Sequence, residues 1–345
     1  MSAGSDRAMA RRKILILPAG KLYNEIIPPS AEAVFASLGE VTRWPADAGR
    51  ISPERALELV PQHDAVVTGW GAAPKFTTDL LDRSPRLKFI GHTAGSIKSF
   101  IFPEVFDRGI TVAYATSAIA DSVGEWALMM ILMSLRRGLQ FANHVQQGGW
   151  GSAGVGYGHE LYRKRVGLVG ASHTARALIP LLKPFGVEVL VYDPYLSDDA
   201  AANLGVRRAR ELDELFTTCD VVSNHAPTTP ETSGMIGAPQ LALLRDGALF
   251  VNTARADAID YDALVAELVS GRIFGALDVF PKEPLAADSQ LRGRDNVILT
   301  PHAAGPTVVE SRARLGELIA GEMARFYAGE PLRHQITKAM LPSMA

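Results

Sequence analysis

Several large classes of protein are excluded by what the sequence lacks. It has one cysteine, Cys219, so neither an internal disulfide nor a cysteine-rich zinc site is expected. Its 35 basic and 37 acidic residues nearly cancel, which leaves no positive field to attract nucleic acid or an anionic membrane. The most apolar run, residues 126–133, is too short to cross a bilayer. We therefore expect a cytoplasmic protein in solution that binds no nucleic acid, membrane or metal.

The first dozen residues lack the apolar segment of a signal peptide, and we leave them out of the predicted fold. The rest of the 345-residue chain is long enough for two domains, and 47% of its residues are hydrophobic, so each domain can bury a core. Cys219 lies beside an apolar strand, and we interpret it as a small core residue rather than a nucleophile.

Short apolar runs alternate with helical patterns in two stretches of the chain, as is typical of βαβ units and parallel sheets. In the first stretch, a helix begins at Pro53 after a capping Ser52, and strands are predicted at residues 13–17, 41–44, 64–68, 87–90 and 111–113. In the second, strands are predicted at residues 165–169, 188–192, 221–225, 248–252, 274–279 and 296–300. Six strands with intervening helices match a doubly wound dinucleotide-binding sheet.

Three further segments frame these stretches. Residues 118–139 are mostly apolar and predict one long helix that serves a core or a subunit contact. Residues 148–159 contain six glycines and predict an irregular arm. From about residue 307 the pattern is helical again, with apolar residues such as Leu315 and Ile319 at helical spacing.

The first strand of the second stretch leads into a glycine turn of the kind that binds phosphate. Gly170 and Ala175 match the pattern G-x-G-x-x-G/A, but Ser172 stands where the second glycine belongs. A serine fits there if its φ is negative, and its hydroxyl could donate to a phosphate oxygen. We predict that the turn and the following His173 and Thr174 contact the cofactor; an ordinary structural turn is the alternative.

Asp193 follows the next strand, about 20 residues beyond the turn. A carboxylate there can accept hydrogen bonds from the adenosine ribose and would repel a 2′-phosphate, which favours NAD(H) over NADP(H). The preference for NAD(H) stays open for two reasons. Asp193 could instead cap the strand end, and three arginines that could attract a 2′-phosphate lie nearby in the sequence: Arg207, Arg208 and Arg210.

An Arg, a Glu and a His each follow a predicted strand at the edge where open α/β sheets bind ligands. They are Arg255, Glu283 and His302. Together they supply a fixed cation, a carboxylate and a titratable imidazole, the groups needed to hold a 2-oxo acid and protonate its carbonyl oxygen. The alternatives are a surface arginine, a solvated loop acid and a capping or core histidine.

With these residues in place, the chain resembles the NAD-dependent D-isomer-specific 2-hydroxyacid dehydrogenases, from about Lys13 to about Pro331. The most specific segments are residues 160–170, 220–227 with Thr232, 247–255, 275–280 and 296–302. The resemblance implies a Rossmann NAD-binding domain (residues 118–305) inserted in a flavodoxin-like substrate domain (residues 13–117), to which residues 306–345 return. It also implies a homodimer formed through the cofactor domain.

The resemblance assigns roles to the residues that match the family's motifs. Arg255 would bind the substrate carboxylate and polarise the C2 carbonyl. His302 would be the acid/base, and Glu283 would pair with it, orient its ring and favour the imidazolium. Asp278 would accept a hydrogen bond from the nicotinamide carboxamide, with a strand-end acid as the alternative. The remaining cofactor contacts would come from Pro227, Thr232 and Thr253, whereas a nearby histidine, His225, is expected to pack.

The substrate carboxylate would also meet backbone N–H groups of the turn at Ala94, Gly95 and Ser96. Many family members have an Asp-Asn pair next, whereas this chain has Ile97 and Lys98. Lys98 is either a solvated loop residue or, as a hypothesis, a group that favours a substrate with a second negative charge.

The sequence thus predicts an NAD(H)-dependent 2-hydroxyacid dehydrogenase that works as a 2-oxoacid reductase, with hydride passing between nicotinamide C4 and substrate C2. Two alternatives stay open. One is a non-catalytic NAD(H)-sensing or partner-binding protein on the same fold. The other is a formate- or phosphite-type dehydrogenase, which Glu283 beside His302 disfavours. The substrate side chain and the physiological direction do not follow from the sequence.

Overall fold

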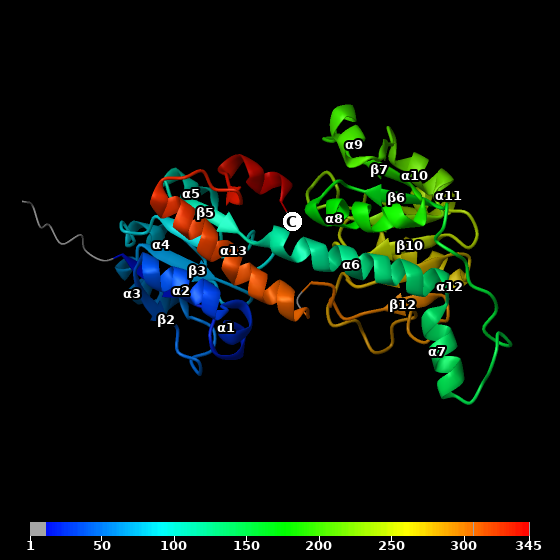
Figure 1. The fold of residues 1–345 in the computed structure, drawn as a ribbon, viewed down its shortest axis with the longest axis horizontal. Helices are drawn as coiled ribbons and strands as arrows, with labels where there is room; N and C mark the ends of the chain where they lie inside the picture. The colour runs from blue at the N-terminus through cyan, green and yellow to red at the C-terminus, as the bar shows by residue number, and fades with distance from the viewer. Residues whose placement is uncertain (1–11, 306, 345) are drawn as a thin grey trace, which may run out of the picture. The chain divides into compact units, whose positions relative to one another are not determined.

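The computed structural model describes residues 12–305 and 307–344 and contains two compact units. One unit comprises the chain up to Ile119 and from Val309 onward, and the other is Ala120–Val308. The domain boundaries predicted from the sequence, after residues 117 and 305, lie close to these. Each unit is built around one parallel sheet (Figure 1), which confirms the predicted α/β class. Of the first dozen residues, left out of the predicted fold, only Arg12 is among the described ones.

The first unit has a flavodoxin-like sheet, with strand order β2-β1-β3-β4-β5. Its parallel strands are β1 (Lys13–Ile16), β2 (Glu40–Arg43), β3 (Ala65–Thr68), β4 (Phe89–His92) and β5 (Thr111–Tyr114). A short strand, β13 (Gln335–Ile336), pairs antiparallel with β5.

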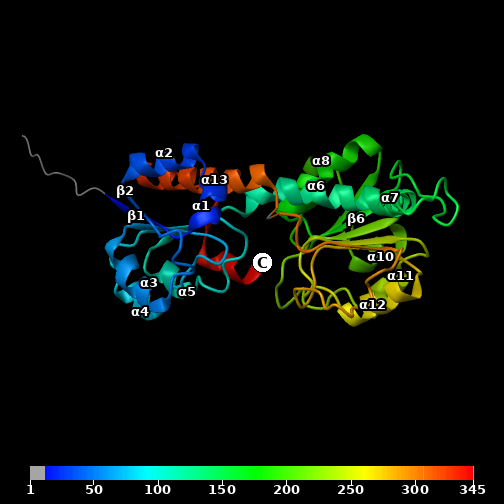
Figure 2. The same cartoon turned by 90° about the horizontal axis from the view of Figure 1, so that it is seen from below.

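Helices cover both faces of this sheet (Figure 2). One face packs against α1 (Gly20–Ile26), α2 (Pro29–Leu38) and α13 (Val309–Ala328). The other packs against α3 (Pro53–Leu59), α4 (Thr78–Asp82) and α5 (Pro103–Asp107). The predicted Ser52 cap is confirmed, because its side chain accepts a hydrogen bond from the N–H of Arg55.

The second unit has the strand order of dinucleotide-binding sheets, β8-β7-β6-β9-β10-β11-β12. All its strands are parallel: β6 (Arg165–Val169), β7 (Glu188–Tyr192), β8 (Arg207–Arg208), β9 (Val221–Asn224), β10 (Leu249–Asn252), β11 (Phe274–Leu277) and β12 (Val297–Leu299).

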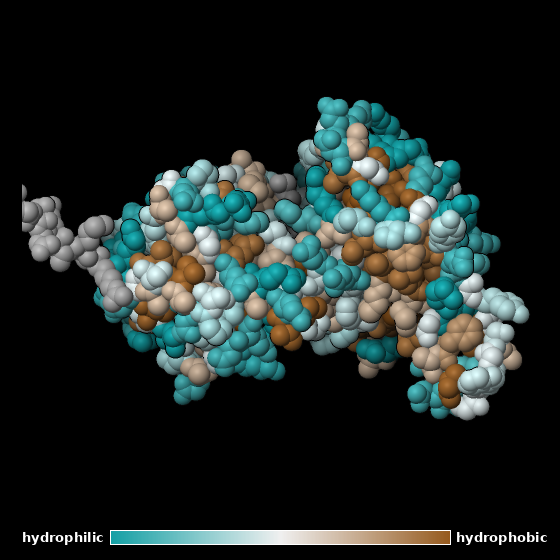
Figure 3. All heavy atoms as spheres, viewed as in Figure 1, coloured by the Kyte–Doolittle hydropathy of each residue, from teal (hydrophilic) through white to brown (hydrophobic). Residues whose placement is uncertain are grey.

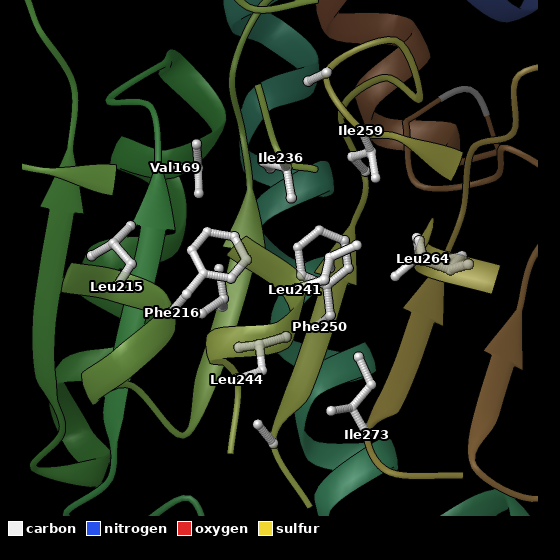
Figure 4. Close-up of a cluster of buried hydrophobic side chains, with 14 of the residues drawn as sticks. Val169, Leu215, Phe216, Ile236, Leu241, Leu244, Phe250, Ile259, Leu264 and Ile273 are labelled. Atoms are coloured by element: carbon white, nitrogen blue, oxygen red, sulfur yellow. The ribbon is translucent and has the colours of Figure 1, made fainter. Parts of the chain in front are cut away.

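Two helical layers bury the apolar faces of this second sheet (Figure 2). One layer contains α6 (Thr116–Leu135), α8 (His173–Leu182) and α9 (Asp198–Leu204). The other contains α10 (Leu212–Thr218), α11 (Ala238–Leu243) and α12 (Tyr261–Ser270). Under the second layer, Phe216 and Phe250 stack with ring centroids 6.4 Å apart in the cluster of Figure 4. Short 3-10 helices span Val60–Gln62, Lys183–Phe185 and Lys338–Ser343.

The prediction of one helix over residues 118–139 is wrong. The helix α6 ends at Leu135, and α7 (Gly138–Gln146) starts after a break. At the break, Arg137 adopts the left-handed region (φ 53°), which cannot continue a right-handed helix. By length and composition alone, α6 would be able to cross a membrane, but half of its apolar window is buried in the structure, as in many core helices.

Candidate active site

The predicted acid/base and its partner lie next to each other in the second unit. The Nδ1 atom of His302 is 2.9 Å from Oε2 of Glu283. The other carboxylate oxygen, Oε1, accepts the backbone N–H of Phe280 at 3.1 Å, so Glu283 is held at both oxygens. The two side chains are 41% and 38% exposed, which leaves His302 accessible to a small molecule. Because Nδ1 faces Glu283, Nε2 is the ring atom that can meet a substrate.

The electrostatic surroundings of Glu283 favour its charged form. Partial burial alone would raise its pKa, but the hydrogen bonds from His302 and from the Phe280 N–H outweigh burial, and the pKa is lowered. The positive charge of Arg255 adds a smaller effect in the same direction. Both His302 and Arg255 therefore favour the carboxylate form of Glu283.

Arg255 lies in the loop after β10 and is half-buried. Its Nη1 donates to the carbonyl oxygen of Ala254 at 2.6 Å. A guanidinium has five N–H donors, so this bond leaves others for a bound carboxylate. The backbone of Arg255 is itself held, because its carbonyl oxygen accepts from the side chain of Asn252 at 3.1 Å.

At the glycine turn after β6, the backbone leaves no room for a side chain on Gly170. Gly170 has φ 93°, and a Cβ there would lie 3.1 Å from backbone atoms of Ala226. Ser172 has φ −61°, the negative value that a serine needs at this position. Its hydroxyl accepts from the N–H of Ala175, so the residue caps α8. An N-terminus of this kind, where α8 begins at the predicted cofactor contacts His173 and Thr174, favours an anion.

Asp193 holds the same turn from the end of β7. One carboxylate oxygen accepts the N–H of Ala171 at 2.8 Å, and the other accepts the N–H of Tyr195 at 2.8 Å. The capping role left open by the sequence is therefore present. Each oxygen retains a lone pair, so a contact with a ribose hydroxyl is compatible with these bonds and stays a prediction.

The three nearby arginines are each paired with carboxylates. Arg207 meets Glu188 and Glu214, and both Arg208 and Arg210 meet Asp198. Their charges are therefore matched within the second unit.

Other predicted cofactor contacts lie at the same sheet edge. The hydroxyl of Thr232 donates to the carbonyl oxygen of Pro227 at 2.6 Å and so shapes the loop after β9. Thr253 is buried, and its hydroxyl has no hydrogen-bond partner within residues 12–305 and 307–344. Asp278 is fully buried, and its carboxylate binds the loop that carries His302. Contact of these residues with a cofactor stays a prediction.

In the first unit, the turn predicted to bind the substrate carboxylate follows β4. Ala94 is buried, whereas Gly95 is half-buried and Ser96 is exposed. A Cβ added at Gly95 would meet nothing within 4 Å, so the turn borders open space. Ile97 is buried in the core, and Lys98 is exposed. Binding of a substrate carboxylate by the N–H groups of this turn stays a prediction.

Two residues interpreted as structural are indeed buried. Burial raises the pKa of the Cys219 thiol to about 11, which keeps it in the unreactive thiol form. His225 is 3% exposed, burial lowers its pKa to about 4, and its Nε2 lies 2.9 Å from the hydroxyl of Ser223. Among the described residues no cluster of His, Cys, Asp and Glu could hold a metal ion.

Comparison with known proteins identifies the family. The sequence model described as "D-isomer specific 2-hydroxyacid dehydrogenase, NAD binding domain" matches residues 128–304. Glyoxylate reductase of Thermofilum pendens is 31% identical over 337 residues, which cover 96% of each chain. D-3-phosphoglycerate dehydrogenase of Methanocaldococcus jannaschii is 30% identical over 92% of this chain and 60% of that protein. The chain spans 51 to 60% of the length of three such phosphoglycerate dehydrogenases.

A solved structure extends the likeness to three dimensions. A phosphoglycerate oxidoreductase from Rhizobium etli is 26% identical, with a TM-score of 0.79 over 95% of this chain and 99% of that one. The protein is thus a member of the D-isomer specific 2-hydroxyacid dehydrogenase family, which confirms the predicted resemblance. Residues 128–304 match the family's NAD-binding domain, which supports NAD(H) as the cofactor.

The residues at the sheet edge fit such a cofactor. The buried hydroxyl of Thr253 has no partner among the described residues and so can form a hydrogen bond with a bound group. Reasoning from the sequence missed two functional candidates, Asn224 and Asn252, whose side chains hold the Arg255 loop. Their position at the last residue of neighbouring strands was the available signal.

Proposed function

We propose that the protein is an NAD(H)-dependent 2-hydroxyacid dehydrogenase that reduces a 2-oxo acid. The observation that carries this proposal is the His302–Glu283 pair with Arg255 close enough to lower the pKa of Glu283. An acid/base, its carboxylate partner and a fixed cation are the groups that this reduction requires.

Each side chain has a distinct task. Arg255 binds the substrate carboxylate and draws electron density from the C2 carbonyl. Bound NADH supplies the hydride that reaches C2. His302 donates a proton from Nε2 to the carbonyl oxygen as the hydride arrives, and it takes the proton back in the reverse direction. Glu283, through Nδ1, holds the ring in place and stabilises the imidazolium.

A substrate panel tests the proposal directly. The protein would be mixed with NADH and one of five 2-oxo acids: glyoxylate, hydroxypyruvate, pyruvate, phenylpyruvate or 2-oxoglutarate. Oxidation of NADH would be followed by the loss of its nicotinamide absorbance. We expect turnover with at least one of these acids. Binding of NADH without turnover of any acid would favour the non-catalytic alternative. In a separate assay with NAD⁺, its reduction to NADH by formate or phosphite would favour the formate- or phosphite-type dehydrogenase.

We further propose that NAD(H) is preferred over NADP(H). Asp193 follows β7 and holds the N–H of Ala171 in the glycine turn, which supports a role beside the ribose. The arginines that could attract a 2′-phosphate are paired with Glu188, Glu214 and Asp198. Comparing kcat/KM with NADH and with NADPH checks this; equal values would contradict it.

We also propose that the protein forms a homodimer through α6, α7 and the glycine-rich arm. Figure 3 shows apolar residues at the surface over α6. Large side chains are exposed on all three segments: Met129 on α6, Val145 on α7, and Trp150 and Tyr157 on the arm. Trp150 is 85% exposed, an unusual state for an aromatic residue outside an interface. Light scattering after gel filtration should give twice the chain mass, and Trp150→Ser should shift it toward the monomer. The cytoplasmic location and the lack of nucleic-acid and membrane partners stay predictions.

A further inference from the structure

Three neighbouring strands of the second sheet end in a buried polar residue. Asn224 ends β9, Asn252 ends β10, and Asp278 follows β11 directly. None of the three is more than 1% exposed. Buried polar groups persist where hydrogen bonds satisfy them, so their partners indicate what they do. We call these three the strand-end polar residues.

The two asparagines hold the backbone of Arg255. They face each other in the parallel register of β9 and β10, and Nδ2 of Asn224 donates to Oδ1 of Asn252 at 3.2 Å. Both side-chain amides also donate to the carbonyl oxygen of Arg255, at 3.4 Å from Asn224 and 3.1 Å from Asn252. Oδ1 of Asn252 accepts the N–H of Ala254 at 3.2 Å. The Thr253–Ala254 peptide and the Arg255–Ala256 peptide are thereby tied to the sheet, one on each side of the Ala254–Arg255 peptide.

Asp278 holds the loop of His302 in the same way. Its Oδ1 accepts from the hydroxyl of Thr300 at 2.6 Å and from the N–H of Ala303 at 2.9 Å. Its Oδ2 accepts the N–H of Ala304 at 3.0 Å, and its backbone oxygen accepts the N–H of His302 at 2.8 Å. His302 has φ 53°, a conformation that a non-glycine residue keeps only where its surroundings enforce it.

The two arrangements are joined. The N–H of Asp278 donates to the carbonyl oxygen of Asn252 at 3.0 Å, so one hydrogen-bonded set reaches from the Arg255 loop to the His302 loop. We propose that the strand-end polar residues are positioning residues that fix Arg255 and His302 relative to each other, with Asn252 at the centre. This inference rests on the proposed function, because it assigns the two held side chains to one substrate.

The variant Asn252→Asp tests the Arg255 half. It keeps the size of the side chain but turns the donor that faces the Arg255 carbonyl into an acceptor, so the two oxygens repel. We expect kcat/KM for the best 2-oxo acid to fall about ten- to hundredfold, mostly through KM, while the Kd for NADH is unchanged.

The same change in the Arg255→Gln background shows whether Asn252 acts through Arg255. If it does, Asn252→Asp should then alter kcat/KM by less than about twofold, since coupled residues are not additive. A loss of the same factor in both backgrounds would overturn the inference. Arg255→Gln alone tests the proposed function separately: an unchanged kcat/KM in that variant would refute the role of Arg255 itself.

A matched control separates positioning from stability. Asn296 uses its side-chain amide in the same way, donating to the carbonyl oxygens of Leu268 and Ile273, but just before β12, at the amino edge of the sheet. Asn296→Asp should lower the melting temperature and leave KM unchanged. A rise of KM in this variant equal to that in Asn252→Asp would overturn the inference.

A pair of variants at Thr300 tests the His302 half without altering any strand-end residue. Thr300→Val removes the hydroxyl that donates to Asp278, and Thr300→Ser keeps it. We expect kcat to fall about tenfold in the valine variant, with NADH binding kept, and to return to within about twofold of wild type in the serine variant. Equal values of kcat in the two variants would overturn the proposed role of Asp278.

Discussion

The carboxyl edges of the two sheets are built differently, although β1 to β5 of the first sheet and all strands of the second are parallel. In the second unit, strand-end side chains reach out and bind the loops of Arg255 and His302. In the first unit, the polar side chains at the strand ends bond within the sheet: the hydroxyl of Thr68 lies 2.8 Å from Nδ1 of His92, and the hydroxyl of Thr93, just after β4, donates to the backbone carbonyl oxygen of Thr68. Burial lowers the pKa of His92 to about 3, so its ring is neutral.

This difference follows from the groups that each edge is proposed to position: side chains in the second unit and peptide groups in the first. Proton transfer and carboxylate binding by side chains need a fixed backbone beneath each of them, and the second edge supplies it. The turn at Ala94 to Ser96 is predicted to use peptide groups instead, which do not depend on neighbouring side chains. Ile97 and Lys98, in place of the Asp-Asn pair that the resemblance leads us to expect, therefore leave these N–H groups in the chain.

The largest expected effect comes from removing the proposed acid/base of the second unit. His302→Ala removes the proton donor, so kcat should fall about 10²- to 10⁴-fold. NADH binding, measured by fluorescence titration, should persist because the glycine turn is untouched. Near-normal turnover would refute the acid/base role.

Glu283→Gln should have the next largest effect. The carboxamide cannot stabilise an imidazolium, so kcat/KM should fall about ten- to hundredfold, the worth of a charge-assisted hydrogen bond. Steady-state kinetics measure the loss, and Glu283→Asp, which keeps the charge, is the control. If the glutamine variant were as active as wild type, Glu283 would not support His302.

The effect of Glu283→Gln on the free energy of unfolding should depend on pH. Because the pKa of Glu283 is lowered in the folded state, its ionisation stabilises the protein above the pKa of the unfolded chain. That contribution is lost as the pH falls through the lowered, folded-state pKa. Urea unfolding should therefore show wild type and Glu283→Gln differing at neutral pH and converging in acid. A difference in unfolding free energy that did not change with pH would contradict the lowered pKa of Glu283.

Gly170→Ala tests the cofactor turn with a smaller effect. The added Cβ meets backbone at 3.1 Å and φ is positive, so we expect a loss of about 1–3 kcal/mol in unfolding free energy and about tenfold weaker NADH binding. Gly247→Ala is the control, because its φ is 78° and its Cβ would meet nothing within 4 Å. Equal NADH affinity in both variants would argue against Gly170 as a cofactor contact.

The smallest expected effect concerns the proposed recognition of the substrate at the carboxyl edge of the first unit's sheet. If Lys98 favours a second anionic group, Lys98→Ala should lower kcat/KM about fivefold for 2-oxoglutarate and leave pyruvate unaffected. Lys88→Ala, at another exposed lysine of the first unit, is the control. Equal losses for both substrates would refute the hypothesis.

The sequence predicted the features that repeat along the chain. Continuous apolar runs such as residues 165–169 located the long strands, but β8 and β13 have two residues each and leave no periodic signal. The break after α6 depends on the left-handed Arg137, which residue type does not reveal. The sequence predicted a cofactor contact for Asp278 and no role for Asn252, because their loop-holding bonds require partners that only the folded chain brings close.

Asp193 has a consequence for how such a protein can evolve. Replacing it to admit a 2′-phosphate would also strip hydrogen-bond acceptors from the N–H groups of Ala171 and Tyr195. Freeing Arg208 and Arg210 for that phosphate would require a second change, at Asp198. A variant changed only at Asp193 would therefore be less stable and would still lack arginines free to bind the phosphate. Because both Asp193 and Asp198 must change together, the proposed preference for NAD(H) would be conserved even without direct selection for it.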